Sequence, residues 1–208
     1  MSRDADPPLQ RFLRGMPMDL DKWREGIGHD LGALAEASPE ERLAIEAALL
    51  AHRPRTWREI EALAALATPP AEAALCEALD DPDPEVRLAV ARYAPAVVAA
   101  ERRTRLLVEA LESAEFYAGL TQALDQVAEW HPPAVERALW RGLLARSGEV
   151  AVHFAAMLAW IHGQARAPFD WDQRPLFLRF NTGNAEERQG AFLDLAGRLG
   201  IDAGIYLD

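Results

Sequence analysis

Apolar residues recur at helical spacing along most of the chain, and prolines with capping side chains divide them into short segments. Residues 68–95 show this pattern most clearly. Thr68 stands before Pro69 and Pro70, and a hydroxyl at the N-cap followed by proline in the first turn favours a helix start. This helix is predicted to end at Asp80-Asp81-Pro82, because proline disfavours the helical conformation in the residue before it.

A second helix is predicted directly after this turn. Asp83 can cap it, and Pro84 suits its first position. One apolar stripe then follows at i, i+3, i+4 and i+7, made by Val86, Ala89, Val90 and Tyr93. Because neither short helix could bury its stripe alone, the two are predicted to pair and to stack on neighbouring pairs.

Short sequences from this pair recur about 64 residues further along the chain. Pro69-Pro70-Ala71 returns as Pro132-Pro133-Ala134, and Glu85-Val86 returns as Glu149-Val150. The intervening residues 102–130 carry apolar positions for one more pair, with a first helix around 106–111 and a second from 115 to 127. The chain is therefore predicted to hold three helix pairs with a period of about 32 residues, which lies in the range of helical repeats.

The stretch DPDPEVRLAVARYA, residues 81–94, resembles the second helix of a HEAT or HEAT-like repeat. The resemblance is clearest from Asp83 to Tyr93 and covers about two thirds of the chain at the level of the repeat. It implies an all-α fold, built as a right-handed α-solenoid of stacked antiparallel helix pairs. It also implies a structural role for Arg87, which would tie neighbouring turns together.

The remaining segments are expected to flank these repeats. Residues 1–18 are rich in proline and predict a loosely ordered lead-in, and residues 19–208 predict a single helical-repeat domain. Within it, residues 19–67 predict N-terminal capping helices, two of which begin at the capping boxes of Ser38 and Thr56. Three helix pairs are expected over 68–162, ending in a strongly apolar helix at 148–162, and residues 163–208 predict an irregular, aromatic-rich C-terminal cap.

Composition places the chain among globular proteins. It has 208 residues, of which 50% are hydrophobic, enough for a substantial core. It has no charged-then-apolar signal pattern and no uncharged apolar run of eighteen residues, so a cytoplasmic protein without a membrane span is expected. The lone cysteine, Cys76, is predicted to be a buried, unreactive thiol on the apolar side of its helix.

The formal net charge of −11 bears most directly on function. Nucleic-acid binding draws its affinity from Lys and Arg that neutralise phosphates, so the charge argues against a nucleic-acid partner. An acidic surface instead favours a basic protein and speeds its encounter. The alternative is that the charge only keeps the protein soluble.

No set of residues predicts a catalytic or metal site, and no cofactor is expected. His153 and His162 are nine residues apart on one predicted helix, which places them about 180° apart, too far round to share a metal. The chain has no P-loop, no Gly-rich dinucleotide turn and no G-x-S-x-G. Metal-binding HEAT enzymes resembling deoxyhypusine hydroxylase carry His-Glu dipeptides, and this chain has none, so the resemblance stops at the scaffold.

Two acidic and aromatic groups are the candidates for binding a partner. Asp170-Trp171-Asp172 places two carboxylates around an indole, which could hold a cation or a basic side chain. Alternatively, the aromatic rings plug the end of the solenoid while the carboxylates cap turns or pair with Arg174 and Arg179. The full set of candidate partner-binding residues is Asp125, Glu129, Trp130, His153, Asp170, Trp171 and Asp172.

These observations favour a non-catalytic protein-binding module, in particular an immunity-type or antitoxin-like inhibitor of a basic bacterial toxin. One alternative is a general scaffold or adaptor. Another is a nucleic-acid enzyme resembling the alkylpurine DNA glycosylases built from HEAT-like repeats. In that family aromatic and acidic residues lie over the lesion, and Trp23, Trp57, Trp130 and Trp171 with Asp125 or Asp170 could fill those roles.

Overall fold

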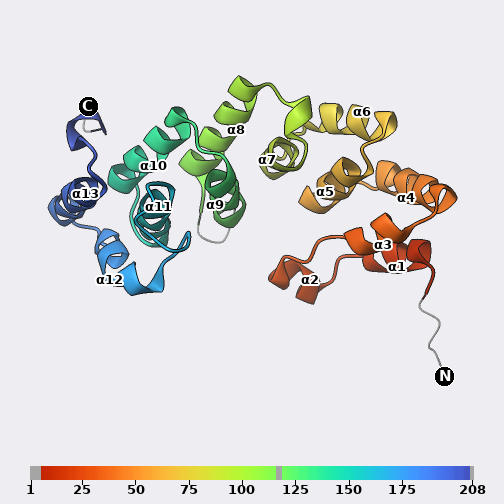
Figure 1. Ribbon diagram of the computed structural model, residues 1–208, viewed down its shortest axis with the longest axis horizontal. Coiled ribbons are helices and arrows are strands. Elements are labelled where there is room, and N and C mark those ends of the chain that lie inside the picture. The colour runs from red at the N-terminus through yellow and green to blue at the C-terminus, as the bar shows by residue number, and fades with distance from the viewer. Residues whose placement is uncertain (1–5, 116–118, 207–208) are drawn as a thin grey trace. The chain divides into compact units, whose positions relative to one another are not determined.

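The structure, a computed structural model, describes residues 6–115 and 119–206, apart from the side chain of Trp23. Within these ranges the regular elements are all helices, with no strand, which confirms the all-α class (Figure 1). The chain divides into two compact units, the N-terminal unit Met1–Ala99 and the C-terminal unit Ala100–Asp208. The single repeat domain expected over 19–208 stays a prediction.

The N-terminal unit is a succession of short helices. They are α1 (Pro8–Gly15), α2 (Leu20–Glu25), α3 (Leu31–Glu36), α4 (Pro39–Ala51), α5 (Trp57–Leu66), α6 (Pro69–Ala78), α7 (Pro84–Tyr93) and the 3-10 helix η1 (Pro95–Val97). The short α2 agrees with the glycines that interrupt this part of the sequence, since glycine is unfavourable inside a helix.

Side-chain caps determine where the best-predicted helices begin. At α4 the Ser38 hydroxyl accepts a bond from the Glu41 amide at 3.2 Å, and the Glu41 carboxylate accepts one from the Ser38 amide at 2.9 Å. The same reciprocal box at Thr56 begins α5. Thr68 and Asp83 cap α6 and α7, each with proline in the first turn. These starts agree with those predicted from the sequence.

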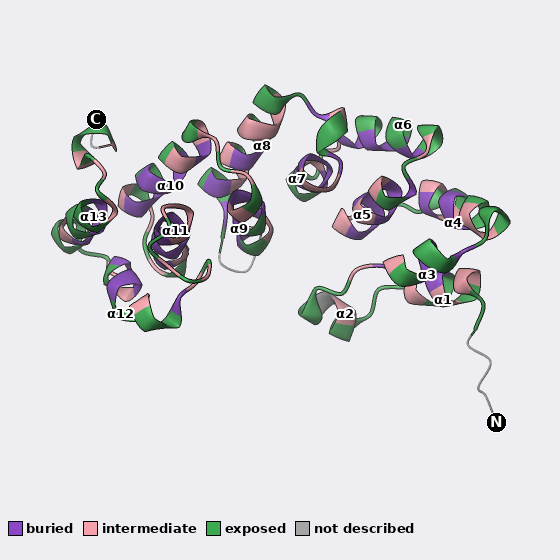
Figure 2. Cartoon of the chain, in the orientation of Figure 1, coloured by how far each residue is buried: buried purple, intermediate pink, exposed green. Residues whose placement is uncertain are grey.

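Helices of this unit contact both their neighbours in sequence and helices two positions away. α4 packs against α6 and α5 against α7, in addition to the successive contacts α4 to α5, α5 to α6 and α6 to α7. Contacts one and two places away in sequence are those expected of stacked helix pairs. The apolar side chains between them are fully or almost fully buried (Figure 2): Ile45, Leu49, Ile60, Leu63, Leu75, Val86 and Val90.

Two features of this unit differ from the sequence analysis. The expected lead-in over 1–18 contains α1, which packs against α3 and α4 and buries Phe12 completely; residues 1–5 lie outside the described ranges. The prediction of a buried thiol at Cys76 is wrong, because this side chain is exposed. α6 buries Leu75, and the next residue lies about 100° further round the helix, toward solvent.

The C-terminal unit has longer helices followed by a compact terminal segment. Its elements are α8 (Ala100–Ser113), α9 (Leu120–Glu129), α10 (Pro133–Ala145), α11 (Glu149–Ile161), η2 (Trp171–Gln173), α12 (Arg174–Phe177), η3 (Leu178–Phe180), α13 (Ala185–Leu199) and η4 (Ala203–Tyr206). The helix expected from residue 115 is described only from Leu120, because 116–118 lie outside the described residues.

α11 is the central helix of the C-terminal unit. It contacts α9, α10, α12, η3 and α13, while α8 packs against α10. Its apolar residues face its neighbours on nearly every side, as the strongly apolar sequence predicts (Figure 2). At Gly142 of α10, an added Cβ would lie 2.5 Å from Cδ2 of Phe154, so glycine permits the close approach of α10 and α11.

The segment 163–208 is more regular than the expected irregular cap. Asn184 caps α13, which spans fifteen residues. Phe177, Phe180 and Phe192 are fully buried, whereas Trp171 is 73% exposed. Trp171 therefore does not plug this unit.

Among the described helices, none combines the length and the apolar character needed to cross a membrane.

Candidate functional site

The candidate partner-binding residues all lie in the C-terminal unit, in two groups. The first group stands at the end of α9 and consists of Asp125, Glu129 and Trp130. The second comprises His153 of α11 with Asp170, Trp171 and Asp172 at η2. Because α9 and α11 pack against each other, both groups belong to neighbouring elements of one unit.

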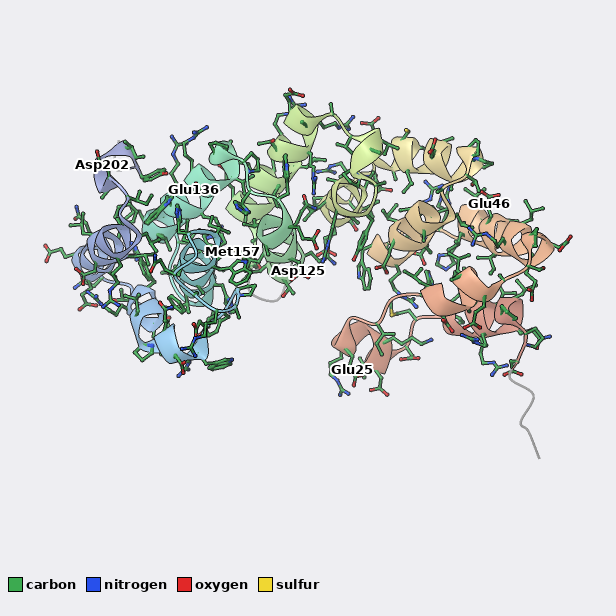
Figure 3. All side chains as sticks on the ribbon, in the orientation of Figure 1. Glu25, Glu46, Asp125, Glu136, Met157 and Asp202 are labelled. Atoms are coloured by element: carbon green, nitrogen blue, oxygen red, sulfur yellow. The ribbon has the colours of Figure 1, made fainter. Side chains whose placement is uncertain are left out.

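The α9 group is organised around a cation–π contact. The guanidinium of Arg103, from α8, lies 4.3 Å from the ring centre of Trp130. Burial lowers the pKa of Arg103, and the nearby Glu129 carboxylate partly opposes this effect. Asp125, labelled in Figure 3, lies one turn before Glu129, and both residues are exposed. The group thus presents carboxylates beside an indole face that an internal cation already covers.

In the second group, the rings form a chain from the core to the surface. His153 lies 5.0 Å from Phe169 between ring centres, and Phe169 lies 5.3 Å from Trp171 and 5.8 Å from Phe177. Burial lowers the pKa of His153, and Glu149 partly opposes this. The imidazole is therefore mostly neutral near pH 7, and the accessible member of the chain is Trp171.

The two carboxylates beside Trp171 have different roles. Asp170 is buried and accepts backbone bonds from Arg166 at 3.1 Å and from Asp172 at 3.0 Å, which lower its pKa. Asp172 is 77% exposed and pairs with Arg166 at 3.2 Å. Asp170 is thus a turn-capping residue, as the structural alternative expected, and only Asp172 faces solvent. The partner of Asp172 is Arg166, rather than the expected Arg174 or Arg179.

This arrangement suits binding by contact better than acid–base chemistry. Trp171 offers a large rigid ring, and Arg174 flanks it at 5.7 Å from the ring centre. Exposed indole and guanidinium groups are frequent energetic anchors of protein interfaces. In the described part of the chain, no three His, Cys, Asp or Glu side chains gather as metal ligands would.

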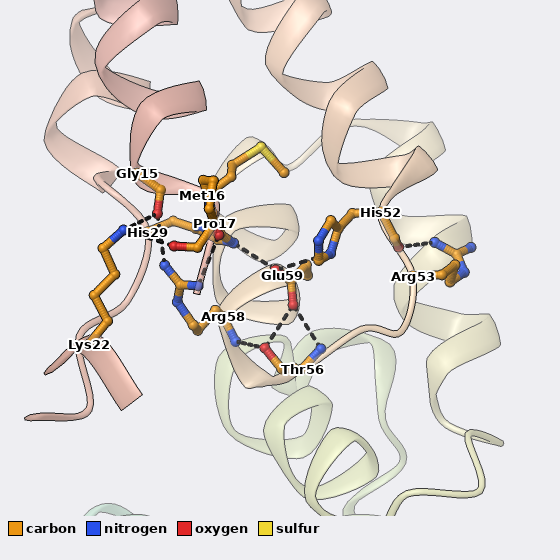
Figure 4. Close-up of polar contacts among 10 residues, drawn as sticks. All are labelled: Gly15, Met16, Pro17, Lys22, His29, His52, Arg53, Thr56, Arg58 and Glu59. Atoms are coloured by element: carbon orange, nitrogen blue, oxygen red, sulfur yellow. Dashed lines mark hydrogen bonds and ion pairs between the residues drawn. The ribbon is translucent and has the colours of Figure 1, made fainter. Parts of the chain in front are cut away.

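A buried polar network in the N-terminal unit was not predicted (Figure 4). Nε2 of His29 lies 2.9 Å from Oε1 of Glu59, and both side chains are at most 2% exposed. The Thr56 hydroxyl donates to the other oxygen of Glu59 at 2.7 Å, and Nδ1 of His52 lies 3.5 Å from Oε1. Burial would raise the pKa of Glu59, but the bonds from His29 and Thr56 outweigh it and lower the pKa to about 2.

The adjacent Arg58 extends this network to the chain between α1 and α2. The whole residue is 2% exposed, and its guanidinium donates to the carbonyls of Gly15 at 3.1 Å and Met16 at 3.2 Å. Lys22 donates to the carbonyls of Gly15 at 3.1 Å and Pro17 at 2.9 Å. His29, Arg58 and Glu59 have almost no contact with solvent, and Arg58 attaches the chain between α1 and α2 to α5.

A third polar cluster, around Glu136, which is labelled in Figure 3, attaches the last described turn of the chain to α10. Oε1 of Glu136 accepts bonds from Nε2 of His162 at 3.0 Å, Nε1 of Trp140 at 3.3 Å and the hydroxyl of Tyr206 at 3.4 Å. The rings of Trp140 and Tyr206 stack with centres 5.3 Å apart. Burial, followed by the charge of Glu136, raises the pKa of Tyr206. This cluster explains His162 as a structural partner of α10.

Sequence signals for these two networks were only partial. The capping box at Thr56 is visible in the sequence, and it places Glu59 at the start of a helix. Nothing local indicates that His29, thirty residues earlier, reaches the same carboxylate. Likewise, Tyr206 and Glu136 are seventy residues apart. The contacts depend on tertiary packing, which spacing along the chain does not specify.

No protein-family model matches this chain, and no curated protein or solved structure matches it either.

Proposed function

We propose that the chain is a non-catalytic module that binds a basic protein, and that it acts as an immunity-type or antitoxin-like inhibitor of a basic bacterial toxin. The scaffold that we propose for it is a right-handed solenoid of HEAT-like helix pairs. Such scaffolds offer extended surfaces with little chemistry of their own. Fold alone does not imply function, so the proposal depends on the charges at the surface.

The observation that carries the proposal is how the N-terminal unit uses its basic residues. Six of them donate to backbone carbonyl oxygens: Lys22, Arg42, Arg53, Arg55, Arg58 and Arg87. Lys22, Arg53 and Arg55 also pair with a carboxylate, whereas Arg42, Arg58 and Arg87 donate to carbonyls, which carry no net charge. These last three cations are thus bound at neutral acceptors rather than at the surface carboxylates of the unit.

The turn between α6 and α7 shows the effect most clearly. We use the name acidic turn for Asp80, Asp81 and Asp83 of this turn together with Glu72 and Glu77 of α6 and Glu85 of α7. Arg87 is the nearest cation in sequence, and it donates to the carbonyls of Asp81 at 2.7 Å and Pro82 at 3.1 Å. Glu77 faces two arginines, since Arg55 lies 3.2 Å and Arg53 3.9 Å from its carboxylate. This surface would attract a basic partner and raise its association rate.

The C-terminal unit would add contact area at its candidate residues. Trp171 is an exposed aromatic residue of the kind that anchors interfaces, and Asp125, Glu129 and Asp172 are exposed carboxylates that a basic side chain could approach. In this proposal the acidic turn supplies attraction over distance, and Trp171 supplies short-range contact.

The test compares two charge-matched double variants as baits for proteins from the source organism. Glu72→Gln with Glu85→Gln removes two exposed charges of the acidic turn, and Glu109→Gln with Glu186→Gln removes two exposed charges of the C-terminal unit. The wild type and the second variant should retain the same basic protein, while the first should retain at least about fivefold less. Retained proteins are identified by mass spectrometry, and affinity is then measured with the purified partner.

Two results would contradict the proposal. One is a partner that is acidic, or one whose affinity the acidic-turn variant leaves unchanged. The other is submicromolar binding of duplex DNA by the wild type, measured by fluorescence anisotropy, which would favour the glycosylase-like alternative.

A further inference from the structure

The C-terminal unit has a depression of about 360 Å³ between η2, α12 and α13. This volume lies near the lower end of the range for small-ligand pockets. Its lining combines apolar and polar side chains: Asp172, Gln173, Pro175, Leu176, Arg179 and Arg198. The first residue of the lining, Asp172, directly follows the exposed Trp171 in sequence.

Some charged side chains at this depression have an ion-pair partner, and one arginine does not. Asp194 and Arg198 stand at i and i+4 on α13, a spacing at which opposite charges usually pair. The Asp194 carboxylate is instead bound by Arg179, with Nη1 2.5 Å from Oδ2. Within the described residues, Arg198 has no carboxylate or carbonyl partner, although its side chain lines the depression.

Asp172, the carboxylate in the lining, does not pair with Arg198. Asp172 pairs with Arg166, whose Nη1 lies 3.2 Å from Oδ2. Arg166 is not part of the lining. Arg174, close by in sequence, lies against the ring of Trp171 rather than against a carboxylate. The lining therefore has an arginine available for a negative group, although the protein as a whole is acidic.

We propose that this depression binds an acidic peptide segment, with a Glu or Asp carboxylate of the segment accepting hydrogen bonds from Arg198. Guanidinium groups bind carboxylates with a fork of two parallel donors. Pro175 and Leu176 provide an apolar contact for the residue beside that carboxylate. The charge complementarity is local and opposite to that of the acidic turn, so this inference stands independently of the proposed function.

The test uses two blocked pentapeptides of sequence Ala-Leu-Glu-Leu-Ala and Ala-Leu-Gln-Leu-Ala, titrated into the full chain. Binding is followed by NMR through the side-chain Nε–Hε signals of arginine. The Glu peptide should shift the Arg198 signal in a saturable way, and the Gln peptide should bind about fivefold more weakly. Inorganic phosphate, titrated alone, should not reproduce the same shift at the same concentration.

Two variants with equal charge change locate the site. Arg198→Gln should weaken Glu-peptide binding about fivefold. Arg141→Gln removes an exposed arginine of α10 outside the depression and should leave binding unchanged. Both variants should melt at the wild-type temperature, as measured by circular dichroism, so that loss of binding is not loss of fold.

The proposal is overturned by equal binding of the two peptides, by equal effects of the two variants, or by absence of any Arg198 shift. A phosphate titration that matches the Glu peptide would also overturn it, because the depression would then be a general anion site.

Discussion

Neutralising Glu59 tests whether the buried network in the N-terminal unit stabilises the fold through a charge. Glu59→Gln keeps the size of the side chain and removes its negative charge. In the folded protein this carboxylate faces His29 at 2.9 Å and Thr56 at 2.7 Å, with at most 2% exposure. We expect the substitution to destabilise the N-terminal unit at pH 7.

The magnitude follows from the pKa. Burial opposes ionisation, but the bonds from His29 and Thr56 lower the pKa of Glu59 from 4.5 to about 2. Each pKa unit corresponds to about 1.4 kcal/mol, so the ionised group contributes about 3 kcal/mol to the free energy of unfolding. Because the folded pKa is depressed, this contribution is complete above pH 4.5 and is lost as the pH falls toward 2. More than half of it, roughly 2 kcal/mol, should be lost by pH 3.

The assay compares wild type and variant at pH 7 and at pH 3. Hydrogen exchange of the α5 backbone amides reports the opening free energy of the N-terminal unit separately from the other unit. The difference between wild type and Glu59→Gln should be about 3 kcal/mol at pH 7 and about 1 kcal/mol at pH 3.

Glu61 provides a matched control on the same helix. Burial raises the pKa of Glu61, so its charge is unfavourable in the folded state. Glu61→Gln should therefore be neutral or slightly stabilising at pH 7, and the advantage should vanish as the wild-type side chain protonates. A Glu59→Gln effect that is the same at both pH values would refute the electrostatic reasoning, since the loss would then come from packing or hydrogen-bond geometry alone.

Three further predictions concern single positions. Val86→Asp places an unpaired charge at a residue that is 1% exposed; several kcal/mol should be lost, and an unchanged melting curve would show that the helix register is misjudged. Gly142→Ala should lower stability by about 1 to 3 kcal/mol, because its Cβ would press on Phe154 and outweigh alanine's better helix propensity; higher stability in urea unfolding would contradict this. Cys76 is exposed, so a thiol reagent should label it in the folded protein at a rate close to that of a free thiol, and protection until unfolding would contradict the structure.

The helix boundaries were largely predictable, because caps act within one turn. Ser38, Thr56, Thr68, Asp83 and Asn184 each cap the helix whose start they were expected to mark. α1 escaped prediction because residues 1–18 were judged by their prolines, although Leu9, Phe12 and Leu13 stand at i, i+3 and i+4 and Pro8 suits the first turn of a helix.

Side-chain environment was less predictable than helix position. Cys76 was assigned to the buried face because it falls at helical spacing among Leu75, Ala78 and Leu79, and a short helix with four alanines among its ten residues does not distinguish its faces by composition. Two roles were open for Trp171, binding a partner or filling the end of the repeats, and its exposure excludes the second. Arg198 in the nearby depression is left without a carboxylate because Asp194 pairs with Arg179. Spacing along the sequence does not show which of the two arginines Asp194 pairs with.

The bonds from arginine to backbone carbonyls have a mechanical consequence. A guanidinium can reach two acceptors at once, and Arg42 of α4 does so with the carbonyl of Leu34 in α3 and that of Leu66 at the end of α5. Arg146 similarly spans the carbonyls of Glu112 and Ala114 at the end of α8. An ammonium group lacks this planar fork. Replacing Arg42 and Arg146 with lysine would preserve every charge but would lose the paired bonds that connect these helix ends. Consistent with this requirement for arginine, the sequence contains a single lysine.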